Sequence, residues 1–340
     1  MTSAKLLPVT SLRDDLEALT ALIQQTASAL GIDQAFIEKD FWVTEVLRAV
    51  APGATMRVGD TQEQVTVVFK GGTSLSRVFH ITHRFSEDVD ILVVFPKATS
   101  TGGRDRALKA MVEASRQHLH LDPENCTTIT STKGIKRNVE FVYPRQFNNA
   151  VVRERVLLEM GSRGGPNPHT RHALRSMIAD YAMEQLGESV NQWQEFEPVE
   201  IEVLNPERTL LEKCALLHNL AARFGPDDPI AVDYMGRAGR HYYDLACLLG
   251  NFEVRSQLRD LGTPGVIQLV DNINDQSTQA GWLFMPRPPD GFAASPAFDT
   301  EAACQATAEQ SFKGALEMVH GPRPTYAECL AVIQAHADLL

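Results

Sequence analysis

The sequence predicts an α+β protein, and three observations lead to that class. Segments rich in β-branched and aromatic residues, which favour buried strands, occur at 65–69, 89–95, 137–143 and 151–160. Apolar residues at helical spacing occur between strands, for example over 104–120. After about Asn205, helical patterns dominate. We therefore expect a core of mixed strands and helices over 1–200 and a mostly helical domain over 201–340.

The N-terminal part of that core predicts two helices. Leu16, Leu19 and Ile23 form one apolar stripe within residues 10–30. A second helix is expected after Gly31, with Asp33 as its N-cap. Phe36, Ile37, Phe41 and Leu47 are expected to supply the apolar face of this second helix.

Composition and charge limit the possible functions. The chain has 340 residues and a formal net charge of −11, so a nucleic-acid partner would have to meet a local basic patch. The five cysteines are widely spaced and form no C-x-x-C pair, which fits a reducing compartment. No apolar run approaches the roughly 20 residues that span a bilayer. We expect a cytoplasmic protein without a membrane partner.

A strand, a glycine pair and a helix start follow one another after residue 65. The residues that open this helix are Gly71, Gly72, Thr73 and Ser74. Glycine lets a ligand approach the backbone, and a helix N-terminus presents unpaired N–H groups. The segment predicts a phosphate site, although many such turns are only turns. Leu75, Val78 and Phe79 are expected to face inward.

Asp88 and Asp90 begin the next predicted strand. Because side chains alternate along a strand, both carboxylates should lie on one face, while Val89, Ile91 and Val93 point into the core. Two adjacent carboxylates repel each other unless a cation lies between them. Mg²⁺ prefers such oxygen ligands and is commonly shared with phosphates. The alternative is a polar strand edge on which both acids are solvated and bind no metal.

Phosphoryl transfer with two metal ions needs a further carboxylate ligand. Glu159, in the predicted strand RERVLLEM, is the first candidate, and Glu140, in NVEFVY, is the second. Either residue could instead be a salt-bridge partner.

The helical half holds two further candidates. Asn205 and Pro206 predict a helix start, and Lys213 follows Thr209 by four residues on one helical face. Lys213 could reach a triphosphate, or it could pair with a surface acid. Asp244 lies in RAGRHYYDLACLL and could be catalytic or the structural partner of an arginine.

Residues 131–175 are locally basic, with nine Lys and Arg against three Glu. Such a segment could guide a polyanion such as tRNA. It could equally be a solvated face whose cations pair with acids elsewhere.

The run KGGTSLSRVF…RFSEDVDI, together with EKDFWVTEVLR, TLLEK and HYYDL, resembles the AbiEii/AbiGii nucleotidyltransferase toxin family, to which the MenT toxins are related. The resemblance implies a polymerase-beta-like nucleotidyltransferase core with a mixed sheet, followed by a mostly helical C-terminal region. It also assigns roles: Gly72 and Thr73 match the phosphate turn, Asp88 and Asp90 the metal carboxylates, and Lys213, Asp244 and Arg84 further active-site positions.

The resemblance implies a magnesium-dependent transfer of NMP from an NTP to a hydroxyl, with two Mg²⁺ ions expected. It further implies a tRNA 3′ end as acceptor, action as a toxin and an antitoxin as partner. Two other functions stay open from the residues alone: a non-catalytic interaction protein of the same fold, and a D-x-D glycosyltransferase. Base preference does not follow from the sequence.

Overall fold

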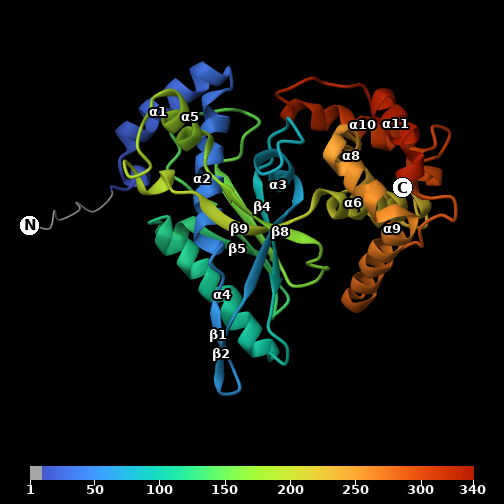
Figure 1. Ribbon diagram of the computed structural model, residues 1–340, viewed down its shortest axis with the longest axis horizontal. Coiled ribbons are helices and arrows are strands. Elements are labelled where there is room, and N and C mark those ends of the chain that lie inside the picture. Colours follow the sequence, from blue (N-terminus) through green and yellow to red (C-terminus); the bar gives the residue numbers. More distant parts are fainter. Residues whose placement is uncertain (1–9) are drawn as a thin grey trace, which may run out of the picture. The chain divides into compact units, whose positions relative to one another are not determined.

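The structure, a computed structural model, describes residues 10–340 and is shown in Figure 1. Contacts between residues divide the chain into two compact units, each built from several segments. The first unit runs to Val67 and includes Glu87–Ser162 and Arg171–Glu202. The second comprises Val68–Ser86, Arg163–Thr170 and Val203–Leu340. The division of the chain at residue 200 into a core and a helical domain stays a prediction.

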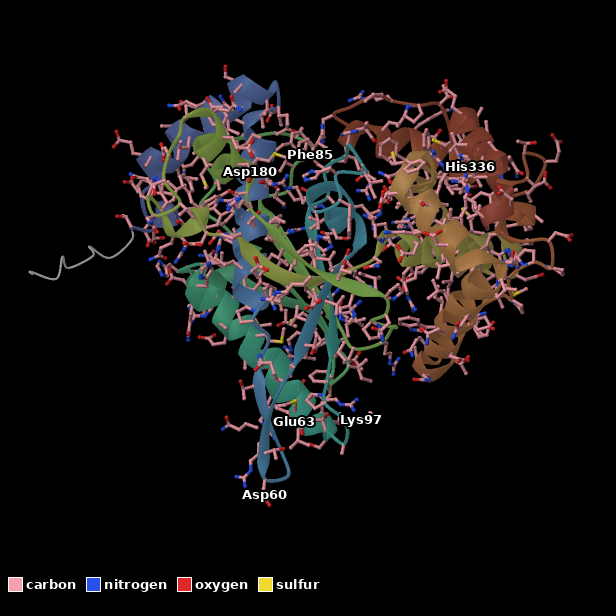
Figure 2. All side chains as sticks on the ribbon, in the orientation of Figure 1. Asp60, Glu63, Phe85, Lys97, Asp180 and His336 are labelled. Atoms are coloured by element: carbon pink, nitrogen blue, oxygen red, sulfur yellow. The ribbon has the colours of Figure 1, made fainter. Side chains whose placement is uncertain are left out.

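Nine strands occur in the described chain, and the unit boundaries fall within three of them, β3, β8 and β9. Their bounds are β1 Thr55–Val58, β2 Thr61–Gln64, β3 Thr66–Lys70, β4 Asp88–Val94, β5 Cys126–Thr132, β6 Lys136–Val142, β7 Arg155–Gly161, β8 His169–Leu174 and β9 Val199–Leu204. β1 and β2 pair as a separate antiparallel hairpin, on which Figure 2 labels the exposed Asp60 and Glu63.

The other strands form a sheet in the order β5-β6-β7-β4-β3-β9-β8. β4 pairs with β7 in parallel, whereas β6 is antiparallel to both β5 and β7. The sheet is therefore mixed, as predicted.

The helices of the first unit are α1 Leu16–Leu30, α2 Gln34–Val50, α4 Thr101–His118 and α5 Met177–Gln185. α2 contacts β4, β7 and α4, and α1 and α5 pack against α2 (Figure 1). Asp33 caps α2 by accepting a hydrogen bond from the Ala35 amide, which confirms the predicted helix start. Alternate residues of β4 and β7, such as Val89 and Leu158, are fully buried. The opposite face of these strands carries the carboxylates.

The second unit is predominantly helical, which confirms the predicted C-terminal region. Its helices are α3 Gly71–Arg77, α6 Pro206–Ala222, α7 Pro229–Met235, α8 Gly239–Gly250, α9 Phe252–Ala280, α10 Gln305–Ala315 and α11 Tyr326–Ala335. α9 is interrupted by Gly262, which has φ 61°, just before Pro264. Short 3₁₀ helices lie at Leu12–Asp14, Pro123–Asn125, Gln194–Phe196, Phe292–Ala294, Pro296–Phe298, Leu316–Met318 and Ala337–Leu339, the first three of them in the first unit.

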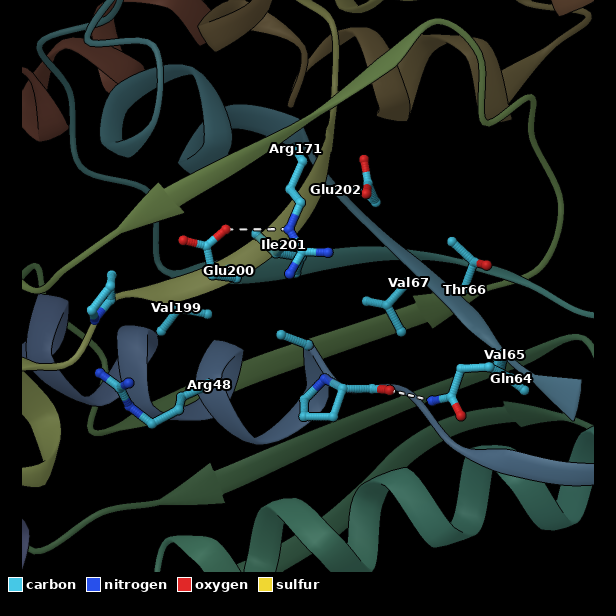
Figure 3. Close-up of a pocket in the computed structure, with 13 residues that line it drawn as sticks. Arg48, Gln64, Val65, Thr66, Val67, Arg171, Val199, Glu200, Ile201 and Glu202 are labelled. Atoms are coloured by element: carbon cyan, nitrogen blue, oxygen red, sulfur yellow. Dashed lines mark hydrogen bonds and ion pairs between the residues drawn. The ribbon is translucent and has the colours of Figure 1, made fainter.

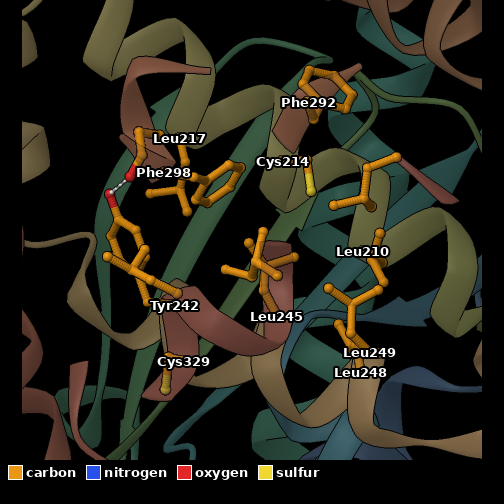
Figure 4. Close-up of a cluster of buried hydrophobic side chains, with 14 of the residues drawn as sticks. Leu210, Cys214, Leu217, Tyr242, Leu245, Leu248, Leu249, Phe292, Phe298 and Cys329 are labelled. Atoms are coloured by element: carbon orange, nitrogen blue, oxygen red, sulfur yellow. Dashed lines mark hydrogen bonds between the residues drawn. The ribbon is translucent and has the colours of Figure 1, made fainter. Parts of the chain in front are cut away.

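One apolar core holds the second unit together. α8 lies at its centre and packs against α6, α9, α10 and α11. Figure 4 shows Leu245 of α8 among the buried side chains, and Tyr242, whose hydroxyl donates to the Ala297 carbonyl. Leu75 of α3 belongs to the same core.

One detail of the sequence prediction is wrong: α3 ends at Arg77, so Val78 and Phe79 follow the helix and are only partly buried, although Phe79 packs against the core of the second unit. Asn205 occupies the N-cap position of α6, which confirms the predicted helix start. Its side-chain oxygen accepts from the Thr170 hydroxyl at 3.1 Å and caps no amide of the helix. Among residues 10–340, none of the helices combines the length and apolar composition needed to cross a membrane. The five cysteines are all free thiols.

Candidate active site

β4 brings Asp88 and Asp90 into the first unit as half-buried side chains, with the fully buried Val89 between them. The parallel neighbour β7 pairs Asp90 with Glu159. Directly paired residues share a face of the sheet, so Glu159 lies beside Asp90. Glu159, which is distant in sequence, thus joins Asp88 and Asp90 in one acidic cluster.

The electrostatics of this cluster favour a cation. Burial raises the pKa of Glu159 to about 7, and the charges of Asp90 and Asp88 contribute to the rise. The carboxylates therefore repel one another, and a bound cation would relieve that repulsion.

The oxygen atoms present fit Mg²⁺. Asn138, paired with Glu159 across β6 and β7, donates a hydrogen bond to it from Nδ2. Asn138 Oδ1 is buried and has no hydrogen-bond partner within residues 10–340. Carboxylate and amide oxygens are the ligands that Mg²⁺ takes. In the described chain no group of three or more His, Cys, Asp or Glu side chains is already arranged to hold a metal ion, so the fit rests on donor chemistry and charge.

Glu140, the second candidate for the extra carboxylate, forms an ion pair with Arg155, its Oε1 lying 2.7 Å from Nε. In the structure Glu140 is thus a salt-bridge partner. Of the two candidates, Glu159 is the better placed to join Asp88 and Asp90.

Lys39 of α2 lies near the start of β4, the strand that carries Asp88 and Asp90. Its ammonium is buried and donates to the backbone carbonyls of Arg153 and Arg155, and lies 3.6 Å from the Glu87 carboxylate. Burial lowers the pKa of Lys39, while the charges of Glu87 and Asp88 oppose the shift. Lys39 thus ties α2 to the strands that carry the carboxylates.

The second unit contains a buried charge cluster around Asp244 of α8. Arg84 binds this carboxylate with two hydrogen bonds, Nε to Oδ1 at 2.6 Å and Nη2 to Oδ2 at 2.8 Å. Lys213 Nζ of α6 lies 2.8 Å from Oδ2. Burial alone would raise the pKa of Asp244, but Arg84 and Lys213 hold it below its usual range. Two cations share one carboxylate, so the cluster carries a net positive charge.

His241 completes this cluster, with its Nδ1 3.2 Å from Lys213 Nζ. Burial, and then the charge of Lys213, lower the pKa of His241 well below its usual value. The ring is therefore neutral at pH 7, and Nδ1 accepts a hydrogen bond from the ammonium. Burial also lowers the pKa of Lys213, with Asp244 opposing the shift.

The glycine turn lies against Arg84. A Cβ on Gly72 would be 2.3 Å from Arg84 Nη2, so only glycine leaves room for the guanidinium. Gly71 has φ 83°, a conformation that glycine adopts readily. Thr73 and Ser74 are buried, and the Ser74 hydroxyl donates to the Gly71 carbonyl at 2.9 Å. α3 has only seven residues, so its dipole is short.

The family model described as "Nucleotidyl transferase AbiEii toxin, Type IV TA system" matches residues 57–330. The chain belongs to this family. It is thus a nucleotidyltransferase toxin of a type IV toxin–antitoxin system, which decides against the interaction protein and the glycosyltransferase. The family also implies a nucleotide substrate and an antitoxin.

Among solved structures, this AbiEii-family chain is similar to MenT4, a nucleotidyltransferase toxin from Mycobacterium tuberculosis H37Rv. The two share 14% sequence identity, over 92% of this chain and 94% of that one, with a TM-score of 0.48. No curated protein matches the chain.

The basic segment of this AbiEii-family member is largely paired with acids. The ion pairs are Arg137–Asp105, Arg145–Glu154, Arg153–Glu87, Arg155–Glu140 and Arg171–Glu200. Figure 3 shows the last of these at a pocket of the first unit. Much of the positive charge counted in the sequence is therefore neutralised locally.

Sequence reasoning missed Lys39, Asn138 and His241 as parts of the two clusters. Lys39 and His241 lie inside motifs that carried the family resemblance, EKDFWVTEVLR and HYYDL, so a signal was present. Asn138 carried none, because its role depends on the pairing of β6 with β7.

Proposed function

We propose that this AbiEii-family chain transfers NMP from an NTP to the 3′-terminal hydroxyl of a tRNA, with Mg²⁺ as cofactor. The observation that carries the proposal is the acidic cluster of Asp88, Asp90 and Glu159. When bound, Mg²⁺ would neutralise phosphate charge and acidify the attacking hydroxyl. A two-ion site is the form that this reaction commonly uses.

Each group of residues has a distinct role. Asp88 and Asp90 hold the metal, and Glu159, with Asn138 beside it, completes the oxygen donors. The net positive cluster of Arg84, Lys213 and Asp244 neutralises triphosphate charge, and the turn at Gly71–Ser74 binds a phosphate. Only three residues of chain separate Arg84 from Asp88.

The proposed reaction transfers the nucleotidyl group from the NTP to the acceptor hydroxyl. The acceptor oxygen forms a bond to the α-phosphorus, and the bond from that phosphorus to the β-phosphate oxygen breaks. Pyrophosphate leaves, and the hydroxyl proton passes to a carboxylate of the acidic cluster. Most of the acceleration comes from positioning and charge stabilisation.

The test uses each α-labelled NTP with Mg²⁺ and total RNA, followed by separation of the labelled species. We expect label on tRNA, and a loss of about a hundredfold or more in Asp90→Asn. Asp60→Asn is the matched control, because this fully exposed side chain lies on the β1–β2 hairpin (Figure 2). A folded Asp90→Asn protein with unchanged transfer would refute the metal assignment, and label on another molecule would refute the acceptor.

A further inference from the structure

A large pocket lies within the second unit, apart from the charge cluster at Asp244. Its volume is about 690 Å³, and one wall is a stripe that runs from Arg208 of α6 to Arg223, the C-cap residue of that helix. The other walls come from α7, the end of α9 and the loop that follows it, together with Gly164 and Gly165. We call it the α6 pocket.

Three aromatic side chains line the α6 pocket while remaining open to solvent. Tyr234 of α7 is 57% exposed, and Trp282 and Phe284 of the loop after α9 are 55% and 36% exposed. Clustered exposed apolar surface of this kind marks a binding site on a soluble protein. Other rings of the second unit, such as Phe292 and Phe312, are buried in its core, and Phe252 of α9 is exposed outside the pocket. The pocket rings are therefore available to a ligand.

The same pocket is cationic, although the whole chain has a net charge of −11. Lys70, Arg163, Arg208 and Arg223 line it, against the single carboxylate of Glu212. Arg208 and Arg223 form ion pairs with Glu212 and Asp228. Arg163 is exposed and donates to the Ala280 carbonyl at 2.7 Å, which fixes it at the rim. The local charge favours an anionic ligand.

The position of Lys70 connects the α6 pocket to the proposed phosphate turn. Lys70 lines the pocket and directly precedes Gly71, as the N-cap residue of α3. α6 supplies both Arg208 at the pocket and Lys213 at the charge cluster. The pocket is therefore linked to the proposed phosphate turn through Lys70 and to the charge cluster through α6.

Flat aromatic rings beside cations are the surface on which single-stranded nucleic acid binds, because bases stack on the rings while phosphates meet the positive charge. We propose that the α6 pocket holds the unpaired 3′ end of the RNA acceptor, with bases stacked on Tyr234 and Trp282. Lys70 and Arg163 neutralise the adjoining phosphates. This inference rests on the proposed function, since it places the acceptor of that reaction.

The test measures binding of a short 5′-labelled single-stranded RNA to the full chain by fluorescence anisotropy, with EDTA and without NTP. Trp282→Leu keeps an apolar side chain but removes the ring, and it should weaken binding about tenfold. Trp282→Phe keeps a ring and should bind close to the wild-type protein. Tyr234→Ala should weaken binding and Tyr234→Phe should not. Phe252→Leu is the matched control, because Phe252 is 70% exposed on α9 and does not line the pocket.

Three results would overturn the inference. If Trp282→Leu and Trp282→Phe both bind RNA as the wild-type protein does, the rings do not stack bases, and the pocket is an apolar surface for a protein. If Trp282→Leu binds RNA normally but loses Mg²⁺-NTP binding in equilibrium dialysis, the pocket holds the donor nucleotide instead. If Phe252→Leu loses as much RNA binding as Trp282→Leu, the effect is not specific to this pocket.

The assay separates this inference from the proposed function. Because RNA binding is measured without NTP or metal, failure of the transfer reaction leaves the result unchanged. Conversely, the wild-type protein could transfer NMP while the Trp282→Leu variant also binds and labels RNA normally. The proposed function would then stand, and the α6 pocket would have no part in it.

Discussion

Gly72 lies so close to Arg84 that any side chain larger than a hydrogen atom would displace the guanidinium. The guanidinium is buried and ion-paired with Asp244, so it has little freedom to move away from an added methyl group. The sequence predicted a role for Gly72 as a phosphate turn, and the structure adds a steric reason for glycine. That reason was hidden from the sequence because it depends on where Arg84 lies.

We expect Gly72→Ala to displace Arg84 and to reduce NMP transfer by about tenfold or more, since positioning supplies much of the catalysis. The measurement is the initial rate with an α-labelled NTP. Gly314→Ala, which adds a Cβ with nothing within 4 Å, is the matched control. A Gly72→Ala protein with wild-type rates would show that Arg84 is not held in its position for catalysis.

Asp244 makes stability depend on pH. Its pKa is depressed in the folded protein, so the stabilisation that it provides is present above the unfolded pKa of about 3.9 and is lost as pH falls through the lower folded pKa. Asp244→Asn leaves two buried cations uncompensated and should cost about 3–5 kcal/mol at pH 7.

Urea unfolding at pH 7 and at pH 3 measures both parts of this prediction. The variant should lose less stability than the wild-type protein between the two pH values, because the titrating carboxylate is gone. An equal loss in both proteins would contradict it.

At the scale of elements, four strands with strong apolar patterns were predicted, whereas exposed strands were missed, and so was β9, in which four of six residues are buried. The segments of β3, β4, β6 and β7 were found because their buried side chains are β-branched or aromatic. β5 has six exposed residues out of seven, so its strand conformation depends on pairing with β6 and not on an apolar face. β2 is exposed throughout, so its strand conformation depends on pairing with β1 in the hairpin.

The residues of the candidate site also divide into those that a local pattern predicts and those that come together only by long-range pairing. Alternation along β4 sufficed to place Asp88 and Asp90 together. The neighbourhood of Glu159 needs the parallel register of β4 and β7, and the Arg84–Asp244 pair joins residues 160 positions apart. Such long-range pairing leaves no periodic signal in one sequence. The resemblance, not spacing, connected Arg84 and Asp244 with the site.

The contact between α8 and α10 provides a prediction for a single element. A Cβ on Gly239 would lie 2.2 Å from the backbone nitrogen of Phe312, and backbone yields far less readily than a side chain. Gly239→Ala should therefore destabilise the protein by about 1–3 kcal/mol, as overpacking does. Gly250→Ala, at the other end of α8 with nothing within 4 Å, is the control. Denaturant unfolding midpoints compare the two, and equal midpoints would contradict the close approach of α8 to α10.

At the scale of the whole molecule, the two units do not follow the order of the chain. Val68–Ser86 lies between strands of the first unit in sequence, yet Leu75 and Ile81 are buried in the core of the second. A boundary near residue 200 was the natural prediction, because the texture of the sequence changes there. Patterns within short windows do not reveal that an early segment packs with helices far along the chain.

Because Leu75 and Leu245 share this core, loss of packing at Leu245 should also destabilise the glycine turn that precedes Leu75. Leu245 is fully buried, so Leu245→Ala should cost about 2–5 kcal/mol. Hydrogen exchange followed by mass spectrometry should show faster exchange in Val68–Ser86 as well as in α8. Faster exchange confined to α8 would mean that the early segment is stabilised independently.

The fit of Arg84 against Gly72 has an evolutionary consequence. Three positions on different parts of the chain, 72, 84 and 244, form one interlocked unit in which a change at any position upsets the other two. Adaptive paths that replace the arginine must therefore alter several codons together. Second-site revertants selected from a damaged Gly72 should map to Arg84 or Asp244 and not to the neighbouring residues of the turn.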